Sequence, residues 1–234
     1  MEEKSVQHKV FVVIPAFNEE KSIGKVVAEI PKLVKEVVVV SNNSTDKTVS
    51  VAKKAGATVL EESRKGYGWA CLKGIDYAYD NGATIITFLD GDYSDYPEQL
   101  TDVIRPIIEN DMDMVIGSRA LGEKIKGSMT FPQVFGNWLA TKLLKIFYGA
   151  KFTDLGPFRA IKVEALKKLQ MSDKTYGWTI EMQIKAAKNK LRFCEVPVDY
   201  KPRIGTSKVS GTIKGAVFAG IKIIFAVFKY KFVR

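Results

Sequence analysis

Segments rich in β-branched residues alternate with helix-forming segments along the first half of this chain, and this alternation most constrains its fold. The expected strands are 10–14, 36–40, 56–60, 84–89 and 112–117. The expected helices between them are 18–30, 47–55, 66–79 and 97–110. Parallel strands need a long crossover connection, and a helix is its usual form. The pattern therefore predicts an α/β domain with a doubly wound, mostly parallel sheet flanked by helices.

Local signals refine these elements. Pro15 is expected to end the first strand, and Glu19 and Glu20 favour a helix start directly after it, because carboxylates stabilise a helix N-terminus. Beyond Gly117 we expect a polar loop over 118–132, a helix over 133–148, a loop running into a strand over 153–161, two more helices, and a strand over 191–200.

The 234 residues, 46% of them hydrophobic, suffice for one domain, which we expect over 1–210, with a basic tail over 211–234. The net charge of +10 is concentrated near the end, because 201–234 carries eight Lys or Arg and no acidic residue. The other 200 residues carry 28 basic and 26 acidic side chains. This distribution argues against a general nucleic-acid-binding protein.

The segment 211–228 is apolar but interrupted by Lys214 and Lys222, and a membrane-spanning helix needs roughly 20 mostly apolar residues. We therefore expect an amphipathic C-terminal helix lying at the membrane interface, peripheral on the inner face of the cell membrane. The alternative is a helix packed on the domain with its lysines solvated.

The cysteines and the histidine exclude other chemistries. Cys71 and Cys194 lie far apart in apolar segments without metal-ligand spacing, which is typical of reduced packing residues in a cytoplasmic protein. His8 is the single histidine, so neither a Ser-His-Asp triad nor a multi-histidine metal site is expected.

Residues 1–4 show no apolar signal region. The turn Pro15-Ala16-Phe17-Asn18 has no glycine-rich phosphate loop, which argues against a dehydrogenase or a P-loop protein.

Asp90-Gly91-Asp92 follows the apolar run 84–89 directly. The carboxyl ends of parallel strands are where α/β sheets bind ligands. The glycine lets the chain turn, so that both carboxylates can approach one hard divalent cation of the kind that accompanies diphosphates. The alternative for this motif alone is a polar turn that closes a strand.

Several motifs together resemble the inverting family 2 glycosyltransferases with the GT-A fold, most closely the polyprenyl-phosphate sugar synthases such as dolichol-phosphate mannose or glucose synthases. The resemblance covers about Val10 to Lys208. It rests on the segments 13–20, 43–46, 89–92, 117–119, 153–159 and 203–208, taken in this order and spacing.

The resemblance implies a nucleotide-sugar donor, linked to UDP or GDP, and a bound Mg²⁺ or Mn²⁺ held by Asp90 and Asp92. The implied donor-binding residues are Pro15, Ala16, Phe17, Glu19, Ser41, Asn43, Asp90 and Gly91. Family members usually carry an Asp where this chain has Ser41, so the charged contact to the base or ribose is missing. A family side chain that can touch the metal is replaced by Ser94, a poor ligand, which we leave out of the metal site.

The resemblance also implies polar residues around the reacting sugar. Asp92, Arg119 and Arg203 are expected to stabilise the leaving phosphate, and Asp154 and Glu181 to lie on the acceptor side. The alternatives are an Asx-type turn for Asp154 and a first-turn helix residue for Glu181. The expected acceptor-binding residues are Arg159, Ser207 and Lys208. Trp69 and Trp178 either stack on a sugar or belong to the core.

The motifs and the family resemblance leave three possible functions. The first is transfer of a sugar to a polyprenyl phosphate at the cytoplasmic membrane face, favoured by Arg203, Ser207 and Lys208 beside a basic apolar tail. The second uses a hydroxyl acceptor in cell-envelope glycan synthesis and requires a positioned base. The third is a catalytically silent protein that binds nucleotide-sugar or lipid, suggested by Ser41 and opposed by the intact Asp90 and Asp92.

Overall fold

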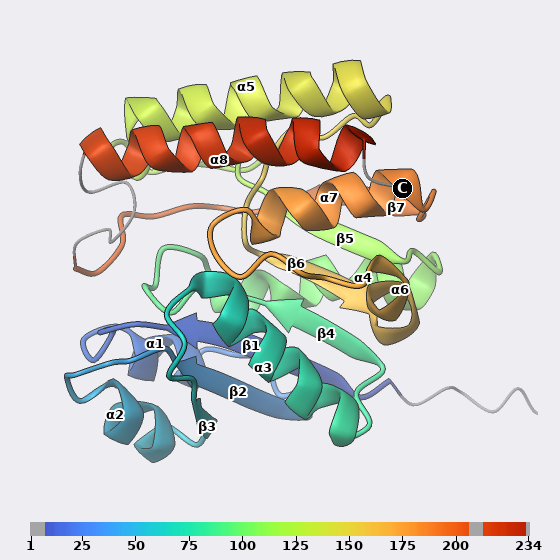
Figure 1. Cartoon of the computed structure of the whole chain (residues 1–234). Coiled ribbons are helices and arrows are strands. Elements are labelled where there is room, and N and C mark those ends of the chain that lie inside the picture. Colours follow the sequence, from blue (N-terminus) through green and yellow to red (C-terminus); the bar gives the residue numbers. More distant parts are fainter. Residues whose placement is uncertain (1–7, 206–212, 233–234) are drawn as a thin grey trace, which may run out of the picture.

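The computed structural model describes residues 8–205 and 213–232. Within them a seven-stranded sheet has the order β3-β2-β1-β4-β6-β5-β7 (Figure 1). The strands are β1 (Val10–Ala16), β2 (Glu36–Ser41), β3 (Thr58–Glu61), β4 (Ile85–Phe88), β5 (Met114–Ser118), β6 (Arg159–Lys162) and β7 (Phe193–Pro197). Neighbouring strands are parallel, except that β6 is antiparallel to both β4 and β5. The predicted α/β fold with a mostly parallel sheet is confirmed.

Helices cover both faces of the sheet because successive side chains of its strands point to opposite sides. In β1, Phe11 and Val13 join one buried cluster, whereas Val10 and Val12 join the other. One face packs on α1 (Ile23–Ala28), α2 (Thr48–Lys54) and α4 (Leu100–Glu109), the last preceded by the 3₁₀ turn η1 (Pro97–Gln99). The other packs on α3 (Tyr67–Asp80), α6 (Val163–Leu169) and α7 (Trp178–Lys188).

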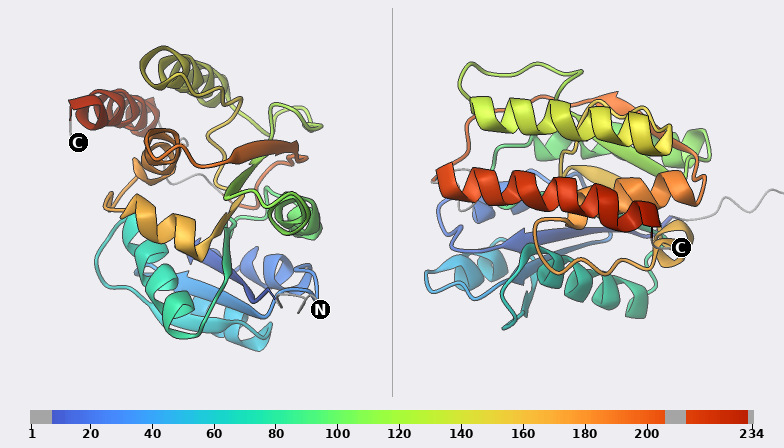
Figure 2. Two further views of the ribbon diagram at one scale, coloured as in Figure 1. Left: turned by 90° about the vertical axis from the view of Figure 1, so that its right-hand side faces the viewer. Right: turned by 45° about the horizontal axis from the view of Figure 1, so that its top comes forward.

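Two long helices, α5 (Phe131–Tyr148) and α8 (Ile213–Phe232), lie side by side over α7 (Figures 1 and 2). Thr130 and Gln133 form a capping box that starts α5, and Gly149 ends it in the left-handed conformation. Among the described residues, no helix has the length and apolarity needed to cross a membrane.

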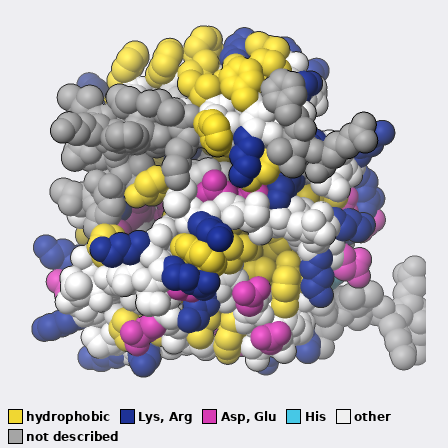
Figure 3. Space-filling model, in the orientation of Figure 1, with side chains coloured by type: hydrophobic (Ala, Val, Ile, Leu, Met, Phe, Trp, Pro, Cys, Tyr) yellow, Lys and Arg dark blue, Asp and Glu magenta, His cyan; other side chains and the backbone are white. Residues whose placement is uncertain are grey.

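The tail helix α8 is partly built into the domain. Ala226, Val227 and Tyr230 are buried in the same cluster as α5 and α7. The Tyr148 hydroxyl donates to the Val227 carbonyl oxygen at 2.5 Å. The packed-helix alternative therefore holds for this face of α8. Its other face leaves Phe225 exposed, and Figure 3 shows hydrophobic side chains gathered along the top of the molecule, over α5.

The structure corrects two local predictions near the first strand. β1 continues through Pro15 to Ala16, and α1 begins only at Ile23. The backbone N–H groups of Asn18, Glu19 and Glu20 do not open a helix, because they donate across to side chains of the loop after β2 and of the first residue of α2. Their acceptors are the side-chain oxygens of Ser44, Thr48 and Asp46, at 3.1, 2.8 and 3.2 Å.

Candidate active site

A cavity of about 380 Å³ opens at the carboxyl ends of β1, β2 and β4, where the sequence predicts a donor site. Its lining includes Pro15, Ala16, Phe17, Glu19, Asn43, Asp90, Gly91, Asp92 and Arg203, all expected in the site. It also includes residues that were not expected, namely Asn42, Lys65, Gly66, Tyr67, Ala70 and Tyr176. The structure therefore joins the turns that follow three neighbouring strands into one polar cavity.

The two carboxylates of the Asp90-Gly91-Asp92 turn face this cavity together. Asp90 accepts a hydrogen bond from the Tyr67 hydroxyl at 3.1 Å. Burial, together with the negative charge of Asp92, raises the pKa of Asp90 to about 7. Two neighbouring carboxylates held in this way lack enough positive charge around them. This arrangement fits a hard divalent cation, which would relieve their repulsion.

Within the described residues, no group of three or more His, Cys, Asp or Glu side chains forms a complete metal site. Mg²⁺ in proteins is commonly held by one or two carboxylates together with substrate phosphates. Ser94 donates its backbone N–H and its hydroxyl to Asp92 Oδ1, at 2.9 and 2.5 Å. Ser94 thus orients the Asp92 carboxylate.

Arg203 connects three loops at the floor of the site. Its guanidinium lies 3.1 Å from Asp92 Oδ2 and 3.2 Å from Glu19 Oε1. The loop after β7 is thereby joined to the turns after β1 and β4. This contact supplies part of the positive charge that the carboxylates need.

The loop that carries Lys65 and Gly66 is held by Asn42. The Asn42 side-chain amide donates to the carbonyl oxygens of Glu62 and Arg64, and its own oxygen accepts from the Gly66 N–H at 2.8 Å. A Cβ on Gly66 would lie 2.1 Å from the Lys174 carbonyl oxygen, so only glycine permits this approach.

Ser41 was predicted to bind the donor, but its side chain does not line the cavity. It is buried and is not among the lining residues, because the chain turns so that Asn42 and Asn43 face the opening instead. The Asn43 amide donates to the carbonyl oxygens of Glu62 and Ser63. Asn42 and Asn43, and not Ser41, therefore line this side of the cavity.

A second cavity of about 310 Å³ shares Tyr67, Asp90, Asp92, Tyr176 and Arg203 with the first. From these shared residues it extends to Arg119 and then to α5 and α8. Its further walls are Met129, Pro132, Gln133, Gly136, Asn137, Leu155, Pro157, Thr179, Tyr200, Gly220 and Ile223. The second cavity therefore joins a charged centre to a mainly apolar end.

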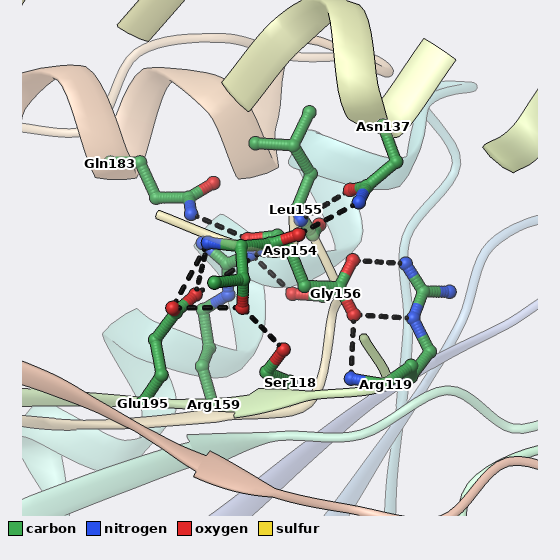
Figure 4. Close-up of polar contacts among 10 residues, drawn as sticks. Ser118, Arg119, Asn137, Asp154, Leu155, Gly156, Arg159, Gln183 and Glu195 are labelled. Atoms are coloured by element: carbon green, nitrogen blue, oxygen red, sulfur yellow. Dashed lines mark hydrogen bonds and ion pairs between the residues drawn. The ribbon is translucent and has the colours of Figure 1, made fainter. Parts of the chain in front are cut away.

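Asp154 positions Arg119 at the boundary between these parts (Figure 4). The Arg119 backbone N–H and Nε donate to Asp154 Oδ2 at 2.8 Å, and its Nη2 donates to Oδ1 at 2.7 Å. Burial by itself would raise the pKa of Asp154, but the charge and hydrogen bonds of Arg119 hold it below its usual value. Asp154 is thus an ionised partner of Arg119. A Cβ on Gly156 would crowd this pair, at 3.2 Å from Asp154 Oδ2.

The backbone of 153–155 is fixed by three elements that lie far apart in sequence (Figure 4). Asn137 of α5 bonds to Thr153 and Leu155. Gln183 of α7 donates to the Asp154 carbonyl oxygen at 2.8 Å, and Glu195 of β7 accepts from the Thr153 N–H at 2.9 Å. These supports were not predicted, since isolated polar residues on amphipathic elements give no sequence signal.

The structure does not bring Glu181 or Arg159 into either cavity, which corrects both predictions. Glu181 is fully buried and accepts from the Ser172 hydroxyl at 2.7 Å and the Tyr230 hydroxyl at 2.8 Å. Arg159 is also fully buried, and its guanidinium donates to the main-chain carbonyl of Thr179 at 3.1 Å and to that of Gly156. Glu181 anchors α8, and Arg159 supports the loop before β6.

The two tryptophans that were predicted either to stack on a sugar or to belong to the core have different surroundings. Trp178 is fully buried and packs on Phe88 with ring centroids 4.6 Å apart, so the core alternative is correct for it. The Trp69 ring contacts the cationic groups of Arg64 and Lys174, 3.6 and 4.4 Å from its centroid. Ser207 and Lys208 lie outside the described residues.

Asp95 is a further buried acid near this centre that the sequence did not reveal. It is 2% exposed, and among the described residues neither carboxylate oxygen has a hydrogen-bond partner. Burial, with the charge of Asp90 adding to it, raises the pKa of Asp95 well above its usual value. The raised pKa favours the protonated, neutral form of Asp95 beside Asp90.

The sheet order, the acidic turn at the strand ends and the adjoining cavities fit the GT-A fold. The model of the glycosyl transferase family 2 matches residues 11–170, and the chain belongs to this family. The chain is 32% identical over 206 residues to the low-salt glycan biosynthesis hexosyltransferase Agl6 of Haloferax volcanii, covering 85% of this chain. It spans about half, 49%, of that relative's length.

A second relative has a similar length. It is the UDP-N-acetylglucosamine–dolichyl-phosphate N-acetylglucosaminyltransferase of Methanococcus voltae, 30% identical over 229 residues, with 86% of this chain and 91% of the relative covered. Glucosyl-3-phosphoglycerate synthase from Mycobacterium tuberculosis, solved with Mn²⁺, UDP-glucose and phosphoglyceric acid, has the same fold with a TM-score of 0.77. That match has 21% identity and covers 97% of this chain and 81% of the other.

Proposed function

We propose that this glycosyltransferase moves a sugar from a nucleotide-sugar to a polyprenyl phosphate, with inversion at the anomeric carbon, at the cytoplasmic face of the cell membrane. The observation that carries the proposal is the second cavity, which links Asp90 and Asp92 through Arg119 to apolar walls on α5 and α8. A polyprenyl phosphate needs positive charge around its phosphate and apolar walls along its hydrocarbon chain. The dolichyl-phosphate acceptor named for the Methanococcus voltae relative supports this acceptor class.

The first cavity, called the donor cavity from here on, is proposed to hold the nucleotide and its diphosphate. Phe17 is 42% exposed at its edge and offers an aromatic face to a base. Asp90 and Asp92 would hold Mg²⁺ or Mn²⁺. When bound, the cation supplies Lewis-acid stabilisation of the negative charge on the departing diphosphate. The metal and UDP-glucose in the Mycobacterium tuberculosis structure support this choice of ligands.

The second cavity, called the acceptor cavity, is proposed to receive the lipid phosphate. Arg119 is fixed by Asp154 in a bidentate pair, so its remaining guanidinium N–H groups are oriented before an acceptor arrives. Arg203 lines both cavities and places positive charge close to the reacting centre. Ser207 and Lys208 remain predicted acceptor contacts.

The proposed reaction needs no base on the enzyme. A phosphate oxygen of the acceptor is already anionic and attacks the anomeric carbon while the bond from that carbon to the diphosphate oxygen breaks. A hydroxyl acceptor would have to lose a proton to a positioned carboxylate. Asp154 is engaged by Arg119, and Glu181 lies outside both cavities, so neither serves this purpose. One displacement converts an α-linked donor into a β-linked product.

The test is a transfer assay with Mn²⁺, UDP- and GDP-sugars, and two matched acceptors, a polyprenyl phosphate and the corresponding polyprenol. We expect product from the phosphate and none from the alcohol, with a β linkage by proton NMR. Equal transfer to the alcohol or to a soluble glycan hydroxyl would establish the second of the predicted functions. An α-linked product would contradict the inverting mechanism.

A further inference from the structure

The outer face of α5 carries exposed hydrophobic residues that neither cavity uses. Phe131, Val134, Phe135 and Trp138 follow the spacing of one helix face, and Phe131 is 81% exposed. Their rings form a surface cluster, with centroids 6.4 Å apart for Phe131 and Phe135 and 5.7 Å apart for Phe135 and Trp138. Exposed apolar residues that gather in one patch are typical of an interaction site.

The neighbouring helix extends this surface. Ile224, Phe225 and Phe228 of α8 are exposed, and Phe228 packs on Phe147 of α5 with ring centroids 5.2 Å apart. Figure 3 shows that hydrophobic side chains gather at the top of the molecule. We call these exposed residues of α5 and α8 the apolar face: Phe131, Val134, Phe135, Trp138, Ile146, Ile224, Phe225 and Phe228.

The charged residues of the two helices that carry the apolar face have one sign. α5 and α8 contain no acidic residue, and Lys142, Lys145, Lys229 and Lys231 are exposed on them. A second copy of this chain would bring equal positive charges together and be repelled. A bilayer containing anionic lipids offers both hydrocarbon for the aromatic rings and negative headgroups for the lysines.

The position of the apolar face also fits a bilayer. Pro132, Gln133, Gly136 and Asn137 of α5 line the acceptor cavity, whereas the apolar face occupies the outer side of the same helix. Only the width of α5 would therefore separate a membrane on the apolar face from the cavity. A lipid acceptor held in that membrane would have its phosphate close to the acceptor cavity.

We propose that α5, together with the exposed side of α8, is an interfacial docking surface for an anionic lipid bilayer, with Phe131, Phe135 and Trp138 entering the headgroup region. This docking proposal rests on the proposed function only where it takes the acceptor to be a lipid. It differs from the sequence prediction, which assigned membrane contact to the tail alone. Binding should persist without donor, metal or acceptor.

The experiment measures co-sedimentation of the full chain with vesicles of phosphatidylcholine, with and without about one third phosphatidylglycerol. We expect binding to the anionic vesicles and a loss of about tenfold or more in the double variant Phe131→Ser/Trp138→Ser. The matched control Leu33→Ser/Ile108→Ser removes exposed hydrophobic residues elsewhere, 43% and 47% exposed. It should bind within about twofold of the unaltered chain, as expected for residues outside the interface.

A spectroscopic measurement locates the contact. Brominated lipids should quench the fluorescence of bound protein, and Trp138→Phe should retain vesicle binding while losing most of this quenching. Equal binding by the double variant and its control would overturn the proposal, as would wild-type protein that ignores anionic vesicles at low salt. A lipid-free dimer that the double variant abolishes would also overturn it, in favour of a second copy.

A short, water-soluble prenyl phosphate separates this surface from the proposed function. The double variant should use it as well as the wild type, because the altered residues lie outside both cavities. If the wild type binds vesicles but fails with every prenyl phosphate, the proposed acceptor is wrong and the docking surface stands. If transfer to the soluble acceptor succeeds and vesicle binding fails, only the docking surface is wrong.

Discussion

The donor cavity and the acceptor cavity meet at Asp90 and Asp92 but are assembled in different ways. The donor cavity is built from turns at adjacent strand ends, and these turns bind one another, as Asn18 does with Ser44. The acceptor cavity is built from α5, the 153–157 segment and α8, which lie far apart in sequence. A site at strand ends can be encoded by local motifs, whereas the second site exists only after helices have packed.

The two cavities also differ in how their charges are balanced. In the donor cavity, Asp90 and Asp92 are only partly compensated, and Asp90 has a raised pKa of about 7. At the acceptor cavity, the lining residue Arg119 is paired with Asp154 behind it, and Asp154 has a lowered pKa. The first arrangement attracts a cation, and the second presents a fixed guanidinium to an anion. Substitutions should therefore affect the two cavities differently.

The largest effect is expected for Asp92→Asn in the donor cavity. Transfer should fall by about a hundredfold or more, because charge stabilisation of the departing diphosphate is lost. The melting temperature should not fall, since the substitution also removes repulsion of Asp90. Asp102→Asn on α4 changes an exposed carboxylate, 48% accessible, and serves as the control. Full activity of Asp92→Asn in excess chelator would exclude the metal role.

Arg203→Ala should impair both cavities. Loss of a charge-assisted contact costs about 1.5–3 kcal/mol, or roughly ten- to a hundredfold in kcat/KM. Because Arg203 touches Asp92 and Glu19, nucleotide affinity should fall together with turnover. Titration calorimetry with UDP or GDP and a steady-state transfer assay measure the two quantities. An effect confined to the acceptor KM would assign Arg203 to the acceptor cavity alone.

Glu181→Gln should weaken the packing of α8 without changing the chemistry. The variant keeps the shape of the side chain but loses the ion pair with Lys185, at 2.7 Å, and a charged acceptor for Tyr230. We expect a loss of about 1–3 kcal/mol in the free energy of unfolding. Urea denaturation measures this loss. A variant of normal stability with greatly reduced kcat would restore Glu181 to the active site.

The sequence allowed prediction of the sheet and most of the donor cavity because these depend on local patterns. Asp90 and Asp92 follow an apolar strand directly, so their location could be inferred. The assignment of Glu181 failed because an acidic residue in a first helical turn has the same signature whatever it contacts. Its partner Tyr230 lies 49 residues further along the chain. The role of Asn42 was hidden for a similar reason, since a polar residue after a strand does not reveal which loop it holds.

Metal binding should depend on pH through Asp90. Its pKa is about 7 in the folded chain and about 3.9 when unfolded, so the folded state holds the extra proton between these values. Stability without metal should therefore fall as pH rises through this window. Mn²⁺ affinity should rise by up to about tenfold per pH unit below pH 7, since the proton and the metal compete.

Calorimetric titration with Mn²⁺ between about pH 5 and pH 8 measures this dependence. The Tyr67 hydroxyl bond lowers the pKa of Asp90, so Tyr67→Phe should move the midpoint upward. An affinity that does not change over this range would mean that Asp90 is not the titrating ligand.

The separation of the two cavities is tested most directly by nucleotide binding to Arg119→Lys. Lysine keeps a positive partner for Asp154 but cannot reproduce the bidentate geometry. With Mn²⁺ present, the affinity for UDP or GDP should stay within about twofold of the wild type, while transfer to polyprenyl phosphate falls by about tenfold or more. Equal losses in nucleotide affinity and transfer would contradict the assignment of Arg119 to a separate acceptor cavity.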